Sequence, residues 1–192
     1  MFTMTLTLSH ALKEWSVAVD ALAEGKTIVL LRKGGIRERQ GRFSVDFDRV
    51  LLYPTYEHQK PDLLKSEYAD SVTTVESGWH PERVSVRAWA QITNIWQISE
   101  KSTVESLLDY HIWNDRFASE RFNWKPNQPL YVLLLRAYLF DGVREISYRS
   151  EYGGCRSWLE IEEAIEVDTQ NPAIGDDEYA QTVDRIEEIV KR

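Results

Sequence analysis

The chain has 192 residues, of which 43% are hydrophobic and 11% aromatic, and its formal net charge is −8. This much apolar surface can form a packed core, which excludes a disordered chain, and the negative charge argues against a protein that coats nucleic acid over its whole surface. A single cysteine, no signal-like opening and no long apolar run together predict a cytoplasmic protein without a membrane span.

Positive charge is concentrated in one segment of the chain. Between Lys26 and Arg42 there are six Lys and Arg residues and one Glu, so this segment carries +5 and the rest of the chain −13. A local anion site on an acidic body is the interpretation that we adopt.

The first elements along the chain are predicted to be a helix and a strand. Apolar residues from Leu8 to Leu22 recur at three- and four-residue spacing, and Gly25 stands where such a helix would end. The segment from Thr27 to Arg32 is β-branched and apolar and has the length of a strand. Two further short strands are expected over residues 42–45 and 49–53, with Pro54 ending the second.

The middle of the chain predicts longer strands. From Val84 onward apolar and polar residues alternate as far as Ile98, which indicates a long half-exposed strand or a bent pair of strands. Ser102 and Glu105 have the spacing of a capping box, which predicts a helix that continues to about residue 112. Residues 130–140 are apolar on both faces and are expected at the centre of a sheet.

The last part of the chain predicts weaker strands and a final helix. Residues 143–148 and 155–161 are strand candidates, and the segment from Tyr179 to Val190 is amphipathic. We therefore expect an α+β fold with a curved, mostly antiparallel sheet or pseudo-barrel and flanking helices. Residues 1–167 are expected to form a single domain, and residues 168–192 an acidic connector and a C-terminal helix packed on it.

The first candidate binding segment follows the strand that ends at Arg32. Paired glycines after a strand permit a positive φ and a close backbone approach, and the flanking basic side chains would bind phosphate or carboxylate. A hairpin with solvated charges is the alternative. The candidate ligand-binding residues here are Arg32, Lys33, Gly34, Gly35, Arg37 and Arg42.

The second candidate segment is the polar loop between Pro54 and Pro61. Rigid polar loops directly after strands often carry sites. Glu57, His58 and Lys60 are catalytic candidates, because a carboxylate and an imidazole can act as acid and base. The alternative is an exposed turn followed by a helix that starts near Pro61. The candidate ligand-binding residues of this loop are Tyr56, His58 and Gln59.

Further candidates are scattered along the chain. His111 and Trp113 lie on or beside an apolar stripe, where a core role is the alternative, and Arg136 interrupts an apolar strand, so it needs either a carboxylate or a ligand. Arg156 and Trp158 follow a second pair of glycines. Cys155, between them and the glycines, is expected to be buried. No Cys or His set has the spacing of a zinc site, so no metal ligand is assigned.

Several of these segments resemble a bacterial family known as domain of unknown function 1802. The resemblance runs from about Ala11 to Ile165 and names a family without implying an activity. A second likeness concerns Gly25, Lys26 and Thr27 before a strand that ends in Arg32. This opening is similar to that of the ASCH group of PUA-like, RNA-associated domains, although leucine stands where that group has an acidic residue. This second likeness implies a curved pseudo-barrel.

The first resemblance, to domain of unknown function 1802, is carried by residues 21–25, 30–38, 41–43, 52–59 and 154–158.

Three hypotheses about function follow, and they leave open whether the protein is an enzyme. In the first, the basic segment binds nucleic acid or a nucleotide-like anion, and an aromatic side chain such as Tyr56, Trp113 or Trp158 stacks on bases, with no cofactor. In the second, the protein is a phosphodiesterase of restriction-nuclease type that uses Mg²⁺. In the third, the acidic helix over residues 177–192 docks on a protein partner. The proposed magnesium-site residues are Glu14, Asp46 or Asp48, Glu57 and Lys60.

Overall fold

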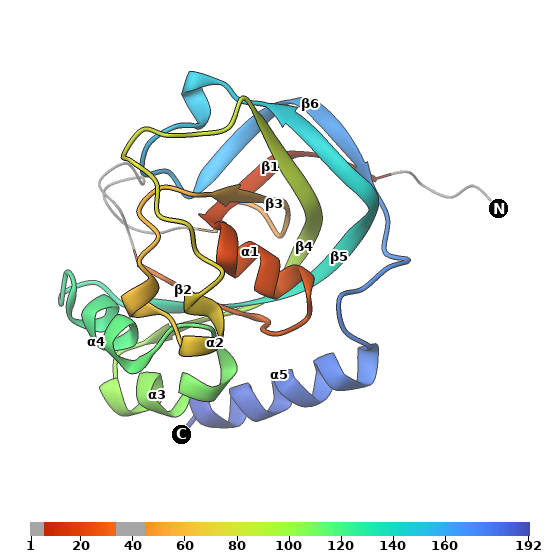
Figure 1. Ribbon diagram of the computed structural model, residues 1–192. Helices are drawn as coiled ribbons and strands as arrows, with labels where there is room; N and C mark the ends of the chain where they lie inside the picture. The colour runs from red at the N-terminus through yellow and green to blue at the C-terminus, as the bar shows by residue number, and fades with distance from the viewer. Residues whose placement is uncertain (1–5, 34–44) are drawn as a thin grey trace.

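The computed structural model describes residues 6–33 and 45–192, and six strands form one mixed sheet (Figure 1). The strand order is β2-β5-β4-β3-β1-β6. β1 and β3 run parallel, and the other four neighbouring pairs are antiparallel. The strands are β1 (Leu6–Trp15), β2 (Val29–Arg32), β3 (Arg49–Thr55), β4 (Arg83–Ile98), β5 (Leu130–Ser147) and β6 (Trp158–Val167).

The sheet curls strongly, because its two longest strands are bent. The register between β4 and β5 shifts twice, between Val86 and Ala88 and again between Ile92 and Asn94, and such bulges bend a strand and increase its twist. The curling returns the end of β2 to the end of β1, although three strands separate the two in the sheet order. The result is the predicted α+β fold with a curved, mostly antiparallel sheet (Figure 1).

Helices cover the sheet and close the larger of two apolar clusters. The helix α1 (Ser16–Ala23) follows β1 directly, packs against β1, β3 and β5, and is almost entirely buried. No helix in the described part of the chain is long and apolar enough to cross a membrane. The other helices are η2 (Pro61–Leu63), α2 (Ser66–Ala69), α3 (Lys101–Ser106), η3 (Leu108–Tyr110), α4 (Asp115–Asn123), η4 (Ser150–Tyr152) and α5 (Asp176–Val190).

The C-terminal helix α5 packs on the sheet through its apolar side. Tyr179 and Ile186 are buried in the main cluster, and the Tyr179 hydroxyl lies 2.6 Å from the hydroxyl of Thr93 on β4. Arg136 on β5 forms an ion pair with Asp176 in the first turn of α5. The guanidinium also lies 4.9 Å from the centre of the Tyr179 ring.

The predicted helix from Leu8 to Leu22 is wrong over its first half. Residues as far as Trp15 form β1, and the helix begins only at Ser16. The strand pairs with β3 on one side and β6 on the other, so Ala11, Leu12 and their neighbours are buried on both faces. An apolar stretch that is buried on both faces has no period that separates strand from helix.

The strands predicted over residues 27–32, 49–53 and 84–98 are observed with small shifts of their ends. The two strands predicted over residues 130–140 and 143–148 are a single strand, β5, and residues 42–44 of the strand predicted over 42–45 lie outside the described residues. Pro54 does not end β3 but lies inside it, in register with Glu14 of β1. The expected capping box is not formed, because α3 begins at Lys101 and no side chain caps it. The helix α4 was not predicted at all.

Candidate nucleic-acid interface

The helix α4 is where the described parts of the two candidate segments meet. From the basic segment, the Lys33 ammonium donates a hydrogen bond of 2.6 Å to the carbonyl of Phe122, in the last turn of α4. From the polar loop, Lys60 lines a surface pocket together with Phe117 and Arg121 of the same helix. The two segments therefore lie against one helix, although about thirty residues of sequence separate them.

The start of α4 is fixed by one side chain. Asn114 accepts a hydrogen bond of 3.0 Å from the Phe117 backbone N–H, as an N-cap residue does. Its amide group also donates to the carbonyls of Asp62 and Leu64, at 2.9 and 3.2 Å. The helix is therefore tied to the segment that directly follows the polar loop.

The pocket beside α4 is aromatic with a charged rim. It has a volume of about 300 Å³, and the indole of Trp124, at its rim, is 39% exposed. The Lys125 ammonium lies 4.6 Å and the Arg121 guanidinium 5.8 Å from the centre of the Trp124 ring. Arg121 also lies 5.1 Å from the centre of the Phe117 ring. We call this surface the α4 face and define it as Trp15, Lys60, Phe117, Arg121, Trp124 and Lys125.

Glu14 is close to two cations, Arg32 and Arg121, and Lys33 is close to Arg121. Glu14 binds the Arg32 guanidinium at 2.6 Å and also accepts from the Trp15 backbone N–H at 2.8 Å. Burial lowers the pKa of Arg121, and Glu14 opposes this shift while the charge of Arg32 adds to it. Burial and the charge of Arg121 also lower the pKa of Lys33, which is only 7% exposed.

On the outer side of α4 the charges are balanced. The Arg116 guanidinium lies 2.8 Å from the carboxylate of Asp62 and 2.9 Å from that of Glu120. Glu120 lines the pocket, so the one described carboxylate at the rim already has a cationic partner. The excess of positive charge is therefore on the inner side, around Glu14.

The front of the polar loop belongs to a different surface. The Tyr56 ring packs edge-on against Trp79 with 5.8 Å between centroids, and the Glu57 carboxylate accepts a hydrogen bond from the Gly78 backbone N–H. His58 is exposed and has a positive φ of 61°, which is uncommon for a residue with a side chain. Tyr56 and Glu57 line a pocket with Trp79, and Lys60 lines the pocket beside α4, so the loop is divided between two surfaces.

Four predicted ligand-binding residues have structural contacts instead. The Gln59 side chain accepts hydrogen bonds from Ser16 and from the Val17 backbone N–H at the start of α1. Arg136 holds α5, as described above. His111 and Trp113 are 2% and 1% exposed, so neither reaches a ligand at the surface.

His111 is neutral in the folded protein. Burial, with a smaller effect of the Lys65 charge, lowers the pKa of its imidazole to about 4, and nearby backbone groups oppose only part of this shift. Trp113 stacks on Phe117 of the α4 face, with 4.9 Å between ring centroids. The two residues therefore support the pocket from below.

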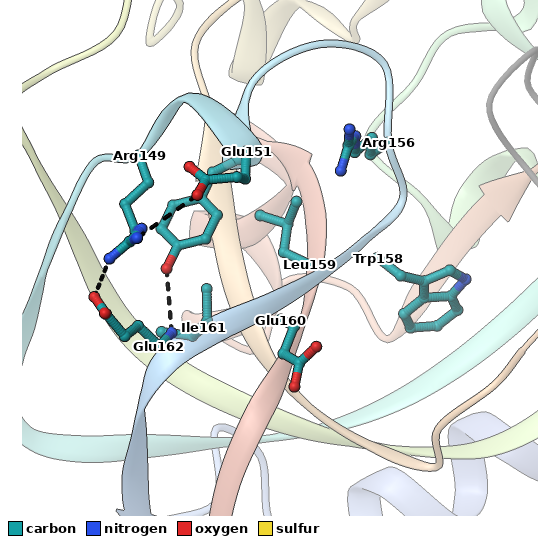
Figure 2. Close-up of a pocket in the computed structure, with 9 residues that line it drawn as sticks. Arg149, Glu151, Arg156, Trp158, Leu159, Glu160, Ile161 and Glu162 are labelled. Carbon is teal, nitrogen blue, oxygen red and sulfur yellow. Dashed lines mark hydrogen bonds and ion pairs between the residues drawn. The ribbon is translucent and has the colours of Figure 1, made fainter.

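Arg156 and Trp158 lie at a separate pocket on the edge strand β6, which we call the β6 pocket (Figure 2). It has a volume of about 420 Å³. At its far end Arg149 forms ion pairs with Glu151 and Glu162, which Figure 2 shows as dashed lines. Cys155, predicted to be buried, is exposed in the loop that leads to this pocket.

The carboxylate cluster of the nuclease hypothesis does not form among the described residues. Glu14 holds Arg32, and Glu57 holds the Gly78 backbone. No group of three or more His, Cys, Asp and Glu side chains in residues 6–33 and 45–192 is placed to hold a metal ion. Gly34, Gly35, Arg37 and Arg42 of the basic segment lie outside the described residues.

Sequence reasoning missed the α4 part of the interface. Arg121, Trp124 and Lys125 were not named as candidates, although residues 121–125 combine two basic and two aromatic residues, a composition typical of nucleic-acid contacts. Trp15 was assigned to a helix. Both omissions concern elements that the sequence analysis missed: α4, which was not predicted, and β1, whose residues were placed in a helix.

Comparisons with known proteins give one family and one group of solved structures. Crystal structures of the ASCH protein from Zymomonas mobilis are similar in fold. One of them is 16% identical in sequence, the match covers 92% of the present chain and 93% of the Zymomonas mobilis chain, and the TM-score is 0.48. A point mutant of the same protein is 14% identical, covers 92% and 94%, and also has a TM-score of 0.48. No curated protein is significantly similar in sequence. The family model for the domain of unknown function DUF1802 matches residues 11–185, and the chain belongs to that family.

Proposed function

We propose that this protein binds single-stranded nucleic acid through the α4 face. The observation that supports the proposal is the exposed indole of Trp124, which has the cations of Lys125 and Arg121 beside its ring and an aromatic pocket next to it. An unpaired base can stack on such a ring, and the neighbouring cations can bind its phosphates.

A single strand fits this surface better than a duplex. Bases present their faces for stacking only when they are unpaired. As far as the structure describes the chain, the α4 face offers a ring and a pocket, not an extended basic stripe that could follow a double helix. A free nucleotide carries the same two groups, a base and a phosphate, so we expect it to compete for the same face.

We propose the cytoplasm as the compartment, because the chain has one cysteine and cannot form an internal disulfide.

The net charge of −8 is compatible with a local site of this kind. An acidic body repels polyanions, so nucleic acid is held only where positive charge is concentrated. Binding through a few cations should be moderate in strength and should weaken steeply with salt, because each phosphate contact releases counterions.

The test is the affinity for short single-stranded RNA and DNA, measured by fluorescence anisotropy at several salt concentrations. Trp124→Ala is expected to weaken binding roughly tenfold or more, since stacking of one base contributes about 1–3 kcal/mol. Trp79→Ala is the matched control, because Trp79 is also exposed, at 47%, but lies on the other surface of the polar loop. No binding by the parent protein at low salt, or equal losses in both variants, would reject the proposal.

A further inference from the structure

Among the described residues, the cations at and beneath the α4 face outnumber the carboxylates that act on them. Arg32 is paired with Glu14, and both side chains are largely buried, at 14% and 9% exposure. Within the described part of the chain, neither Lys33 nor Arg121 forms an ion pair. In the same part of the chain, the Lys33 ammonium donates to one carbonyl, that of Phe122, which satisfies one of its three N–H groups.

Two largely desolvated cations without a counterion are unfavourable. An ammonium or guanidinium removed from water loses hydration that only a partner charge or several hydrogen bonds can replace. Burial is the first cause of the lowered pKa of both groups, and a neighbouring cation adds to it: Arg121 for Lys33, and Arg32 for Arg121, where Glu14 opposes the shift. A bound anion would relieve both effects.

The position of the cations relative to the pocket restricts which anion fits. Arg121 lines the aromatic pocket, and the residue after it, Phe122, supplies the carbonyl that holds Lys33. A phosphate at these cations therefore belongs to the nucleotide whose base lies in the pocket. An internal phosphodiester carries a single negative charge, whereas a phosphate monoester carries about −1.5 to −2 at neutral pH and presents three terminal oxygens.

We infer that the α4 face recognises the end of a strand, with Arg121 and Lys33 binding a terminal phosphate monoester while the base of the same nucleotide lies against Trp124. This inference rests on the proposed function and makes it more specific. It predicts a preference for phosphorylated over hydroxyl ends, and a nucleoside monophosphate is the smallest ligand with the same chemistry.

The experiment compares three forms of one short oligonucleotide that carries its fluorophore at an internal position. The forms have a 5′ phosphate, a 3′ phosphate or hydroxyl groups at both ends. One phosphorylated form is expected to bind roughly tenfold tighter or more than the hydroxyl form, because hydrogen bonds between charged groups are worth about 1.5–3 kcal/mol. Competition with a nucleoside monophosphate and with inorganic phosphate distinguishes a strand end from phosphate alone.

Two variants test whether Lys33 and Arg121 are the residues that bind the terminal phosphate. Lys33→Met keeps most of the length of the side chain and removes its charge, and Arg121→Gln replaces the charge by a shorter polar side chain at a less buried position. Both are expected to abolish the preference for the phosphorylated end. The hydroxyl form should still bind Lys33→Met, which also shows that this variant is folded, and should bind Arg121→Gln more weakly, because Arg121 lies beside the Trp124 ring. Arg116→Gln, on the outer side of α4 and already paired with Asp62 and Glu120, is the matched control and should keep the preference.

The outcomes separate the inference from the function on which it rests. Equal binding of all three forms, still dependent on Trp124, would overturn the inference and leave the proposed function intact. A preference that survives both Lys33→Met and Arg121→Gln would also overturn it, because the phosphate would then be bound elsewhere. Failure of every form to bind the parent protein would reject the proposed function, and the inference with it.

Discussion

The α4 face and the β6 pocket both combine arginine with tryptophan beside a surface hollow, and they differ in what their charges meet. The β6 pocket is the larger, at about 420 Å³ against about 300 Å³, but its Arg149 is paired with Glu151 and Glu162. At the α4 face Arg121 lies over aromatic rings and shares a single carboxylate with Arg32. The balance of charge, more than the size of the hollow, therefore distinguishes a surface that attracts an anion from one where carboxylates outnumber the arginines.

The largest expected effect is on stability, when the carboxylate of Glu14 loses its charge. Glu14→Gln should lower the free energy of unfolding by about 3 kcal/mol, because it leaves buried cations without their partner. Urea unfolding without added anion measures this. Glu162→Gln removes the corresponding partner of the exposed Arg149 and is expected to leave the unfolding midpoint unchanged. Similar effects of the two variants would mean that Glu14 does not neutralise a buried cluster.

Only part of the α4 face could be predicted from the sequence. Arg32, Lys33 and Lys60 were anticipated because their types and positions next to a strand or proline are visible in the sequence. Their meeting at α4 is tertiary and has no local signal. α4 itself has few apolar residues, with Phe117 and Ala118 buried, so no helical period marks it, and it begins at the Asn114 cap.

Strands were predictable where a local pattern of apolar residues marks them. The alternation over β4 and the apolar run of β5 identified the two longest strands. β1 was not recognised, because Leu8 to Trp15 is stabilised by pairing with β3 and β6, which are distant in sequence. Its apolar spacing matched a helix equally well, and non-local pairing decided the outcome.

Acid should weaken the α4 side of the molecule through His111. Its pKa is about 4 in the folded protein against an ordinary value of 6.5, so as the pH falls the unfolded chain takes up the proton first. The stability that this group contributes is complete above pH 6.5 and is lost as the pH falls toward 4, by about 3 kcal/mol in total. His111→Phe should flatten this part of the profile.

The measurement is the free energy of urea unfolding as a function of pH for the parent and the variant. His80 provides the comparison on the other surface of the polar loop, because it is exposed and stacks on Tyr148 at 3.3 Å between ring centroids. His80→Phe should keep the slope of the parent protein. If His111→Phe also kept that slope, another group would be responsible for the loss of stability in acid.

The smallest effect, and the one that most directly compares the two regions, is on the salt dependence of binding. Lys125 lies 4.6 Å from the centre of the Trp124 ring at the α4 face, and Arg144 lies 5.2 Å from the centre of the Phe140 ring on β5, beside β6. Both are cations over aromatic rings, so the two variants remove the same kind of contact. Lys125→Ala should reduce the slope of log K against log salt by about one, the amount expected for one lost phosphate contact, whereas Arg144→Ala should leave it unchanged. Equal reductions would show that nucleic acid responds to the overall charge of the protein and not to the α4 face.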